Sequence, residues 1–149
     1  MLKYITGDLV KQAEEFDLIG HGANCFCTMG SGIAPLIKNK FPEAFEVDCE
    51  TLVGDRKKLG TISYTKRTTP IVVNCYSQYD YRGRRNNIMD LNYDALRSAM
   101  KLIKENFSGK RMGFPMIGSG LAGGDWNIIS KIIEEELDGE DVTIVQLPK

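Results

Sequence analysis

The sequence is poor in the residues on which many phosphate-handling enzymes depend. It has one histidine, His21, and no evident carboxylate cluster, which argues against a two-metal phosphatase. None of its four cysteines has the C-x5-R spacing of a thiol phosphatase, and no Walker A run is present. No apolar run approaches the length of a membrane span. These absences exclude several common chemistries but leave phosphate binding itself open.

The charges are balanced. Nineteen Lys and Arg face twenty Asp and Glu, for a net charge of -1, without the basic excess typical of proteins that bind nucleic acid through its phosphates. Hydrophobic residues make up 42% and charged residues 26%, ordinary values for a globular chain. With no repeat or linker-like segment, the sequence predicts one domain over residues 1–149. The first residues lack a signal-peptide pattern, so we expect a cytoplasmic protein without membrane contact.

The cysteines (Cys25, Cys27, Cys49 and Cys75) are too sparse for a disulfide scaffold. Cys25 and Cys27 are separated by one residue, which is not zinc-ribbon spacing, and His21 adds no second ligand pair. We therefore expect no metal and no cofactor, and we expect buried thiols in a reducing compartment.

Hydrophobic periodicity and turn residues predict alternating strands and helices. Strands are expected over 2–6, 16–21, 61–66, 70–74, 111–116 and 142–147, and helices over 9–15, 32–40, 42–52, 91–107 and 125–137. The clearest helix carries Leu96, Met100, Ile103 and Phe107 on one stripe. This order predicts a three-layer α/β/α sandwich with a mixed, largely parallel central sheet. In such sheets, ligands bind at the carboxyl ends of the strands.

A glycine-rich loop over residues 118–124 follows a predicted strand and precedes a helix that Asp125 caps. Glycines let a ligand approach the backbone, and free N–H groups at a helix start bind anions. Gly118, Gly120 and Gly123 match G-x-G-x-x-G, but only one strand follows, so a dinucleotide fold is excluded. Phosphate binding is the favoured interpretation, and a flexible turn without a ligand is the alternative.

A second polar loop runs from His21 through Asn24 to Ile33, also between a strand and a helix. Both loops open on the same sheet edge, so residues 29–33 and 118–124 are expected to face each other across one diphosphate. The Asn24 amide both donates and accepts, which suits a ribose hydroxyl or a water molecule, or else satisfies the loop backbone.

Three further polar residues have two interpretations each. His21 is either a catalytic group or a structural hydrogen-bonding residue. Asp8 either accepts from an exocyclic amine such as that of adenine or is a turn residue after Gly7. Asp125 caps a helix and can also activate a water molecule.

Three segments in series resemble the macrodomain family. They are the Ile5–Leu9 start (ITGDL), the His21–Asn24 loop (HGAN) with its following GSGIA, and the late segment IGSGLAGGDW. The resemblance spans essentially the whole chain. It is greatest to the branch that contains yeast-type ADP-ribose-1''-phosphate phosphatases and hydrolases that remove ADP-ribose from acidic side chains or DNA. It implies the ligand ADP-ribose.

The resemblance also implies roles for individual residues. Asp8, with the neighbouring backbone of Leu9, would contact adenine, and Asn24 would contact the distal ribose. One wall of the diphosphate site would be Gly30, Ser31, Gly32 and Ile33, and the other Ser119, Gly120, Leu121, Ala122 and Gly123. His21 takes the place of an Asn in the common NAAN form of the motif. Whether Tyr76, Tyr79 and Tyr81 stack on adenine or cover a hydrophobic edge stays open.

One departure concerns the nucleophile. Some members of this branch use a lysine near the end of the central strand, where this chain reads VVNCY over residues 72–76. Lys66 lies in the preceding predicted strand, so a lysine adduct is not expected. Cys75 is either a substitute nucleophile or a small buried thiol.

These observations favour an enzyme that converts ADP-ribose 1''-phosphate to ADP-ribose and phosphate. Asn24 would position the attacking water, His21 or Asp125 would activate it, and loop N–H groups would stabilise the phosphoryl oxygens. The alternatives are a hydrolase that removes ADP-ribose from protein or nucleic acid, a module that only binds ADP-ribose, and a structural domain without a nucleotide ligand.

Overall fold

The structure, a computed structural model, describes residues 1–148 except for the side chain of Arg84. Its strands are β1 (Lys3–Thr6), β2 (Leu18–Gly22), β3 (Ile62–Tyr64), β4 (Ile71–Cys75), β5 (Arg111–Phe114) and β6 (Asp141–Gln146). Its helices are α1 (Ala34–Lys40), α2 (Pro42–Cys49), α3 (Tyr93–Phe107) and α4 (Trp126–Glu136), with short 3-10 turns η1 (Ala13–Glu15), η2 (Arg56–Lys58) and η3 (Gly83–Asn86). Within this described part, no helix combines the length and apolarity needed to cross a membrane.

The six strands form one sheet in the order β1-β6-β5-β2-β4-β3. Neighbouring strands are parallel except β3, which pairs antiparallel with β4. This confirms the predicted mixed, largely parallel sheet. Because β2 and β5 are neighbours, the loops that follow them leave the sheet side by side at its carboxyl edge.

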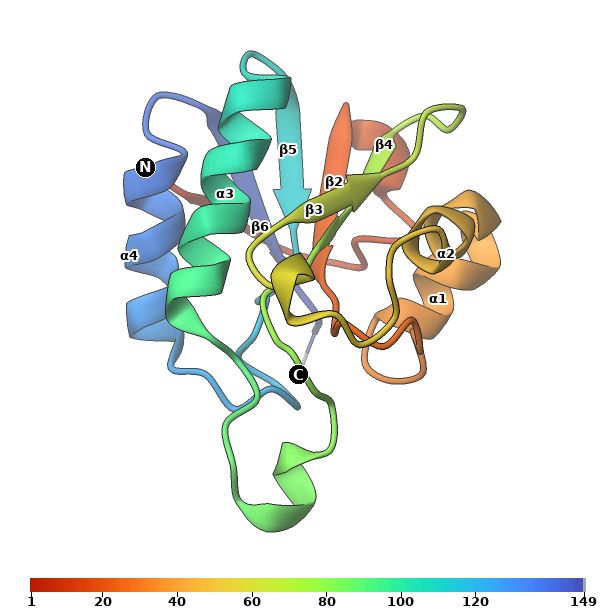
Figure 1. The fold of residues 1–149 in the computed structure, drawn as a ribbon. Coiled ribbons are helices and arrows are strands. Elements are labelled where there is room, and N and C mark those ends of the chain that lie inside the picture. The colour runs from red at the N-terminus through yellow and green to blue at the C-terminus, as the bar shows by residue number, and fades with distance from the viewer. Residues whose placement is uncertain (149) are drawn as a thin grey trace.

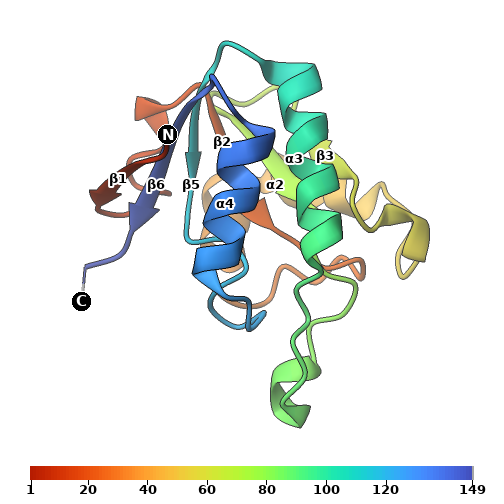
Figure 2. The same ribbon diagram turned by 90° about the vertical axis from the view of Figure 1, so that its left-hand side faces the viewer.

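Helices cover both faces of the sheet, which gives the predicted three layers (Figures 1 and 2). One apolar core lies beneath α3 and α4, and a second lies beneath α1 and α2. The predicted stripe of α3 is buried along its whole length, from Leu96 to Phe107. The central strands β2, β4 and β5 are mostly buried, whereas β1 at the edge of the sheet is exposed, so the loops that follow β2 and β5 start from the buried centre of the sheet.

The helix predicted over residues 9–15 does not form, and only η1 is present there. The Asp8 carboxylate accepts from the N–H groups of Val10 and Lys11 at 3.0 and 3.1 Å, and the Gln12 side chain accepts from the Asp8 N–H at 2.8 Å. These local side-chain bonds compete with helical hydrogen bonds and hold a turn instead.

A projecting arm, residues 78–91, connects β4 to α3 and was not predicted. It extends beyond the carboxyl edge of the sheet and carries η3 near its tip (Figures 1 and 2). At its base, Gln78 and Leu91 form an antiparallel bridge. The arm therefore leaves the body of the domain next to the loops that follow β2 and β5.

Candidate functional site

A cavity of about 510 Å³ lies at the carboxyl edge of the sheet, a size typical of small-molecule sites. Both predicted loops and the base of the arm line it. The order of the strands gives the cavity a direction. Asp8, Val145 and Leu147 lie at the end beside β1 and β6, and Asn24, Gln78 and Asp90 lie at the end beside β2 and β4.

Asn24 organises the first loop from within. Its Oδ1 accepts from the Phe26 N–H at 2.8 Å, and its Nδ2 donates to Thr28 Oγ1 at 2.7 Å. The loop also places Cys27 and Met29 in the left-handed region, with φ of 57° and 40°. Asn24 thus satisfies loop backbone, as one interpretation held, while it also lines the cavity.

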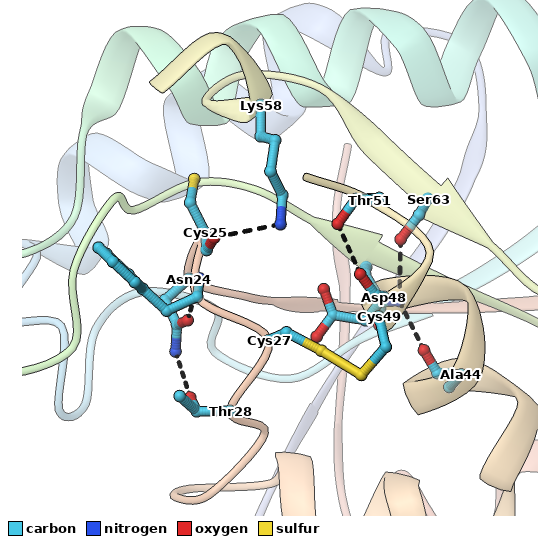
Figure 3. Close-up of a disulfide and its surroundings, with 12 residues drawn as sticks. Asn24, Cys25, Cys27, Thr28, Ala44, Asp48, Cys49, Thr51, Lys58 and Ser63 are labelled. Carbon is cyan, nitrogen blue, oxygen red and sulfur yellow. Dashed lines mark hydrogen bonds between the residues drawn. A yellow bond between two sulfur atoms is a disulfide. The ribbon is translucent and has the colours of Figure 1, made fainter. Parts of the chain in front are cut away.

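A disulfide links the first loop to the end of α2 (Figure 3). Cys27 and Cys49 are bonded, with their Cα atoms 5.5 Å apart. The prediction of free buried thiols is wrong for this pair, because tertiary packing brings together two cysteines that are 22 residues apart. It is confirmed for Cys25 and Cys75, which are free and buried.

The free thiol of Cys75 is unsuited to nucleophilic attack. Burial raises its pKa to about 12, and the thiolate is the reactive form. Of the two interpretations of Cys75, the geometry favours the small buried thiol.

The second loop is shaped by glycine. Gly118 and Gly123 have φ of 77° and 79°, and the Gly124 N–H donates to the Gly118 carbonyl at 2.8 Å. Gly120, Leu121 and Ala122 line the cavity. Among the described residues, nothing accepts from the N–H groups of these three. Consecutive free N–H groups of this kind form a concave anion site.

Three predicted residues of this segment lie outside the cavity lining. The Ser119 hydroxyl donates to the Met116 carbonyl at 2.7 Å, and the Gly123 N–H donates to the Gly120 carbonyl at 3.1 Å. Asp125 caps α4 through the Asn127 N–H at 2.9 Å. These three residues have local hydrogen bonds instead of a place on the cavity wall.

On the opposite wall, the predicted residues Gly30, Ser31, Gly32 and Ile33 all line the cavity. Gly32 has φ of 63°. Within the part of the chain that the structure describes, no acceptor meets the N–H groups of these four residues. The two loops therefore present free backbone donors to one shared space.

His21 lies on the floor of the cavity and is fully buried. Its Nε2 is 2.7 Å from Asn74 Oδ1. Asn74 Nδ2 donates to the Ala44 carbonyl and to Ser63 Oγ, so Oδ1 is the acceptor and His21 Nε2 carries the proton. Burial lowers the pKa of His21, so the ring is neutral at pH 7.

A buried acid next to the disulfide was not foreseen. Asp48 lines the cavity and is 1% exposed, and its carboxylate accepts from the Tyr76 hydroxyl at 2.6 Å. Burial raises the pKa of this carboxyl group. In the sequence, Asp48 is a charged residue in a predicted helix, as many exposed residues are. Nothing in its local sequence therefore indicates that it is buried or that it lines a site.

The three tyrosines do not form one stacking surface. Tyr76 is buried, the Tyr79 hydroxyl donates to the Gly54 carbonyl at 2.7 Å, and Tyr81 is exposed and lines the cavity at the β4 end. At the Asp8 end, the lining is aliphatic and includes Leu36 and Leu147. The structure thus favours aliphatic contacts at that end.

The arm adds Asp90 and Gln78 to the site, and the sequence pointed to neither. Asp90 Oδ2 accepts from the Gly83 N–H at 2.9 Å, and the neighbouring Leu91 N–H donates to the Ala122 carbonyl at 3.2 Å. A polar loop without periodicity gives no indication of which side chain turns back toward the domain.

The family model of the Macro domain matches residues 21–133. An uncharacterized 17.5 kDa protein of Enterobacteria phage T4 is 34% identical, over 97% of this chain and 96% of its own length. The ADP-ribose glycohydrolase OARD1 of Bos taurus is 30% identical, over 96% of this chain and 88% of its own length.

A more distant relative and a solved structure with a similar fold each match almost the whole chain. The ADP-ribose 1''-phosphate phosphatase of Debaryomyces hansenii is 22% identical, over 91% of this chain and 93% of its own length. The solved structure of Thermosipho africanus DarTG in complex with ADP-ribose has a TM-score of 0.75 at 18% identity, over 98% of this chain and 42% of that chain.

Proposed function

The chain belongs to the Macro domain family, and from this premise we propose that it binds ADP-ribose and hydrolyses a bond to the distal ribose. The observation that carries the proposal is the pair of facing walls, Gly30–Ile33 and Gly120–Ala122, with free N–H groups that open on one cavity. Backbone donors of this kind bind phosphate oxygens without a cationic side chain.

The direction of the cavity orients the proposed ligand. Adenine lies at the Asp8 end, where one carboxylate oxygen is used by the turn and the other accepts from the exocyclic amine, with the Leu9 backbone beside it. The diphosphate lies between the two loops. The distal ribose then reaches Asn24 and the base of the arm.

The charges at the distal end favour a substrate in which ADP-ribose is linked to a macromolecule. Asp48 and Asp90 line that end, and the described lining residues include no lysine or arginine. A carboxylate such as that of Asp90 would repel a terminal phosphate dianion. An ester between the distal ribose and an acidic side chain adds no such charge, and the relative at 30% identity is an ADP-ribose glycohydrolase.

Hydrolysis of ADP-ribose 1''-phosphate is the second candidate. It is supported by the 22% identical phosphatase of Debaryomyces hansenii. In this reaction, Asn24 would position the water, while catalytic roles for His21 and Asp125 stay predictions. The third candidate is a module that binds ADP-ribose without turnover, and the experiment must distinguish it from the two hydrolases.

One sample is sufficient for the test. Calorimetry with ADP-ribose comes first, followed by turnover of three substrates: ADP-ribose 1''-phosphate, a peptide ADP-ribosylated on glutamate, and an oligonucleotide ADP-ribosylated on a base. We expect binding and release of ADP-ribose from the peptide. Asp8→Asn should weaken ADP-ribose binding about tenfold, the loss of one hydrogen bond to a charged group.

The control is Asp138→Asn, an exposed aspartate in the turn after α4, at the opposite end of the sheet from the cavity. It should leave binding unchanged. Absence of ADP-ribose binding would refute the proposal as a whole. Phosphate release without peptide cleavage would make the phosphatase the correct reaction, and binding without turnover would make the protein a binding module.

A further inference from the structure

The arm places one carboxylate at the distal end of the cavity. Asp90 lines the cavity and is half-buried. The adjacent Leu91 is fixed on both sides, because it bridges Gln78 and its N–H donates to the Ala122 carbonyl at 3.2 Å. Asp90 is therefore held directly beside the second loop, although it lies in a segment that projects from the domain.

One oxygen of this carboxylate is occupied and the other is available. Oδ2 accepts from the Gly83 N–H at 2.9 Å. A Cβ atom on Gly83 would lie 2.5 Å from Asp90 Oδ1 and 2.7 Å from the Ile88 carbonyl, so the arm folds over Asp90 only with glycine at this position. Across the described residues, no donor meets Oδ1. The arm thus orients the carboxylate and leaves one acceptor for water.

The other titratable groups that line the cavity are differently placed. Asp8 lies at the opposite end, Asp48 is 1% exposed beneath the Tyr76 hydroxyl, and His21 is fully buried. Arg82, on the same arm, is a further charged group. The pKa of the Arg82 guanidinium group is raised mainly by Asp80 and to a smaller extent by Asp90.

We infer that Asp90 is the catalytic base of the proposed hydrolase. Its free Oδ1 accepts a proton from a water molecule as the water oxygen forms a bond to C1'' of the distal ribose. The bond between C1'' and the ester oxygen breaks, and its electron pair remains on the side chain that is released as a carboxylate. The proton on Asp90 then passes to solvent, so the reaction consumes one water and needs no other reactant.

The variant Asp90→Asn tests this assignment, which rests on the proposed function. Asparagine keeps the shape and an acceptor for the Gly83 N–H, so the fold and the ligand site are preserved. We expect kcat for the glutamate-linked peptide to fall about 100-fold or more, the usual contribution of a general base. The Kd for ADP-ribose should stay within about threefold, and we expect the pH profiles of turnover by the wild type and by Asp90→Asn to differ on the acidic side.

Asp138→Asn is the matched control and should keep wild-type kcat and pH profile. Asp90→Glu, which retains the carboxylate, should recover more activity than Asp90→Asn. Turnover by Asp90→Asn within about threefold of the wild type would overturn the assignment alone. A loss of ADP-ribose affinity equal to the loss of turnover would also overturn it, because it would indicate a structural role. Wild-type protein that binds ADP-ribose without turnover would overturn both the hydrolase and its base.

Discussion

The two walls of the cavity present the same kind of surface but are built in different ways. The first loop is shaped by side chains: the Asn24 amide bonds within the loop, and the Cys27–Cys49 disulfide ties it to α2. The second loop is shaped by absent side chains, since Gly118 and Gly124 leave no room for a Cβ atom. Reduction of the disulfide can therefore release the first wall from α2, whereas the conformation of the second wall can be changed only by substitution of its glycines.

The largest expected effect is loss of the disulfide. The Cys27→Ser/Cys49→Ser double variant should lower the free energy of unfolding by about 3 kcal/mol, because the cross-link restricts the unfolded chain. It should also weaken ADP-ribose binding, because the first loop loses its tie to α2. Denaturant unfolding and calorimetry measure the two effects.

The control for this prediction is built into the protein. Reduction of the wild type should reproduce the stability of the double variant, and the same reductant should leave the double variant unchanged. Equal unfolding of oxidised and reduced wild type would contradict the contribution of the cross-link.

A smaller loss is expected from Gly124→Ala in the second wall. The added Cβ would lie 2.8 Å from the Gly118 carbonyl oxygen and 2.9 Å from Ile129 Cδ1, so backbone must move. We expect a loss of roughly 2 kcal/mol, typical of overpacking, measured by thermal or denaturant unfolding. The control is Gly120→Ala in the same loop, where a Cβ meets nothing within 4 Å. If both variants unfold alike, close packing does not explain the glycine.

Asn24→Ala should have a smaller effect again, mainly on binding. It removes the acceptor of the Phe26 N–H and the donor to Thr28. We expect about a tenfold weaker ADP-ribose affinity, or about 1.4 kcal/mol. Thr28→Val, which breaks only the bond to Asn24 Nδ2, should cost less. Equal losses in the two variants would show that Asn24 acts through the loop and not on the ligand.

The smallest effect concerns pH. Burial lowers the pKa of His21, so the folded state binds fewer protons than the unfolded state, and stability falls as pH drops below about 6.5. The expected loss between pH 7.5 and 5.5 is about 1 kcal/mol, and His21→Gln should remove it. Asp48, with its raised pKa, contributes in the opposite direction. Wild type and variant are therefore compared at each pH, and parallel curves would refute the role of His21.

The sequence predicted the parts that local patterns determine. The stripe from Leu96 to Phe107 identified α3, and the two glycine loops were found because strand, loop and helix follow one another directly. It did not predict the Cys27–Cys49 bond or the position of Asp90. The bond and the position of Asp90 both depend on contacts between segments that are distant in the chain. The local sequence around Cys27, Cys49 and Asp90 is that of an ordinary loop or helix.

The pairing of β1 with β6 has a consequence for how the site is made. Lys3 pairs with Thr143, so β1 and β6, which are far apart in the sequence, are neighbours in the sheet. The Asp8 end of the cavity is therefore lined by residues from two distant segments: Asp8 follows β1, and Leu147 follows β6. During translation, the loop after β2 emerges early, but this end of the cavity is complete only after β6 has left the ribosome. Ligand binding at this end thus requires β6 as well as β1, and it is acquired together with the pairing of these two strands.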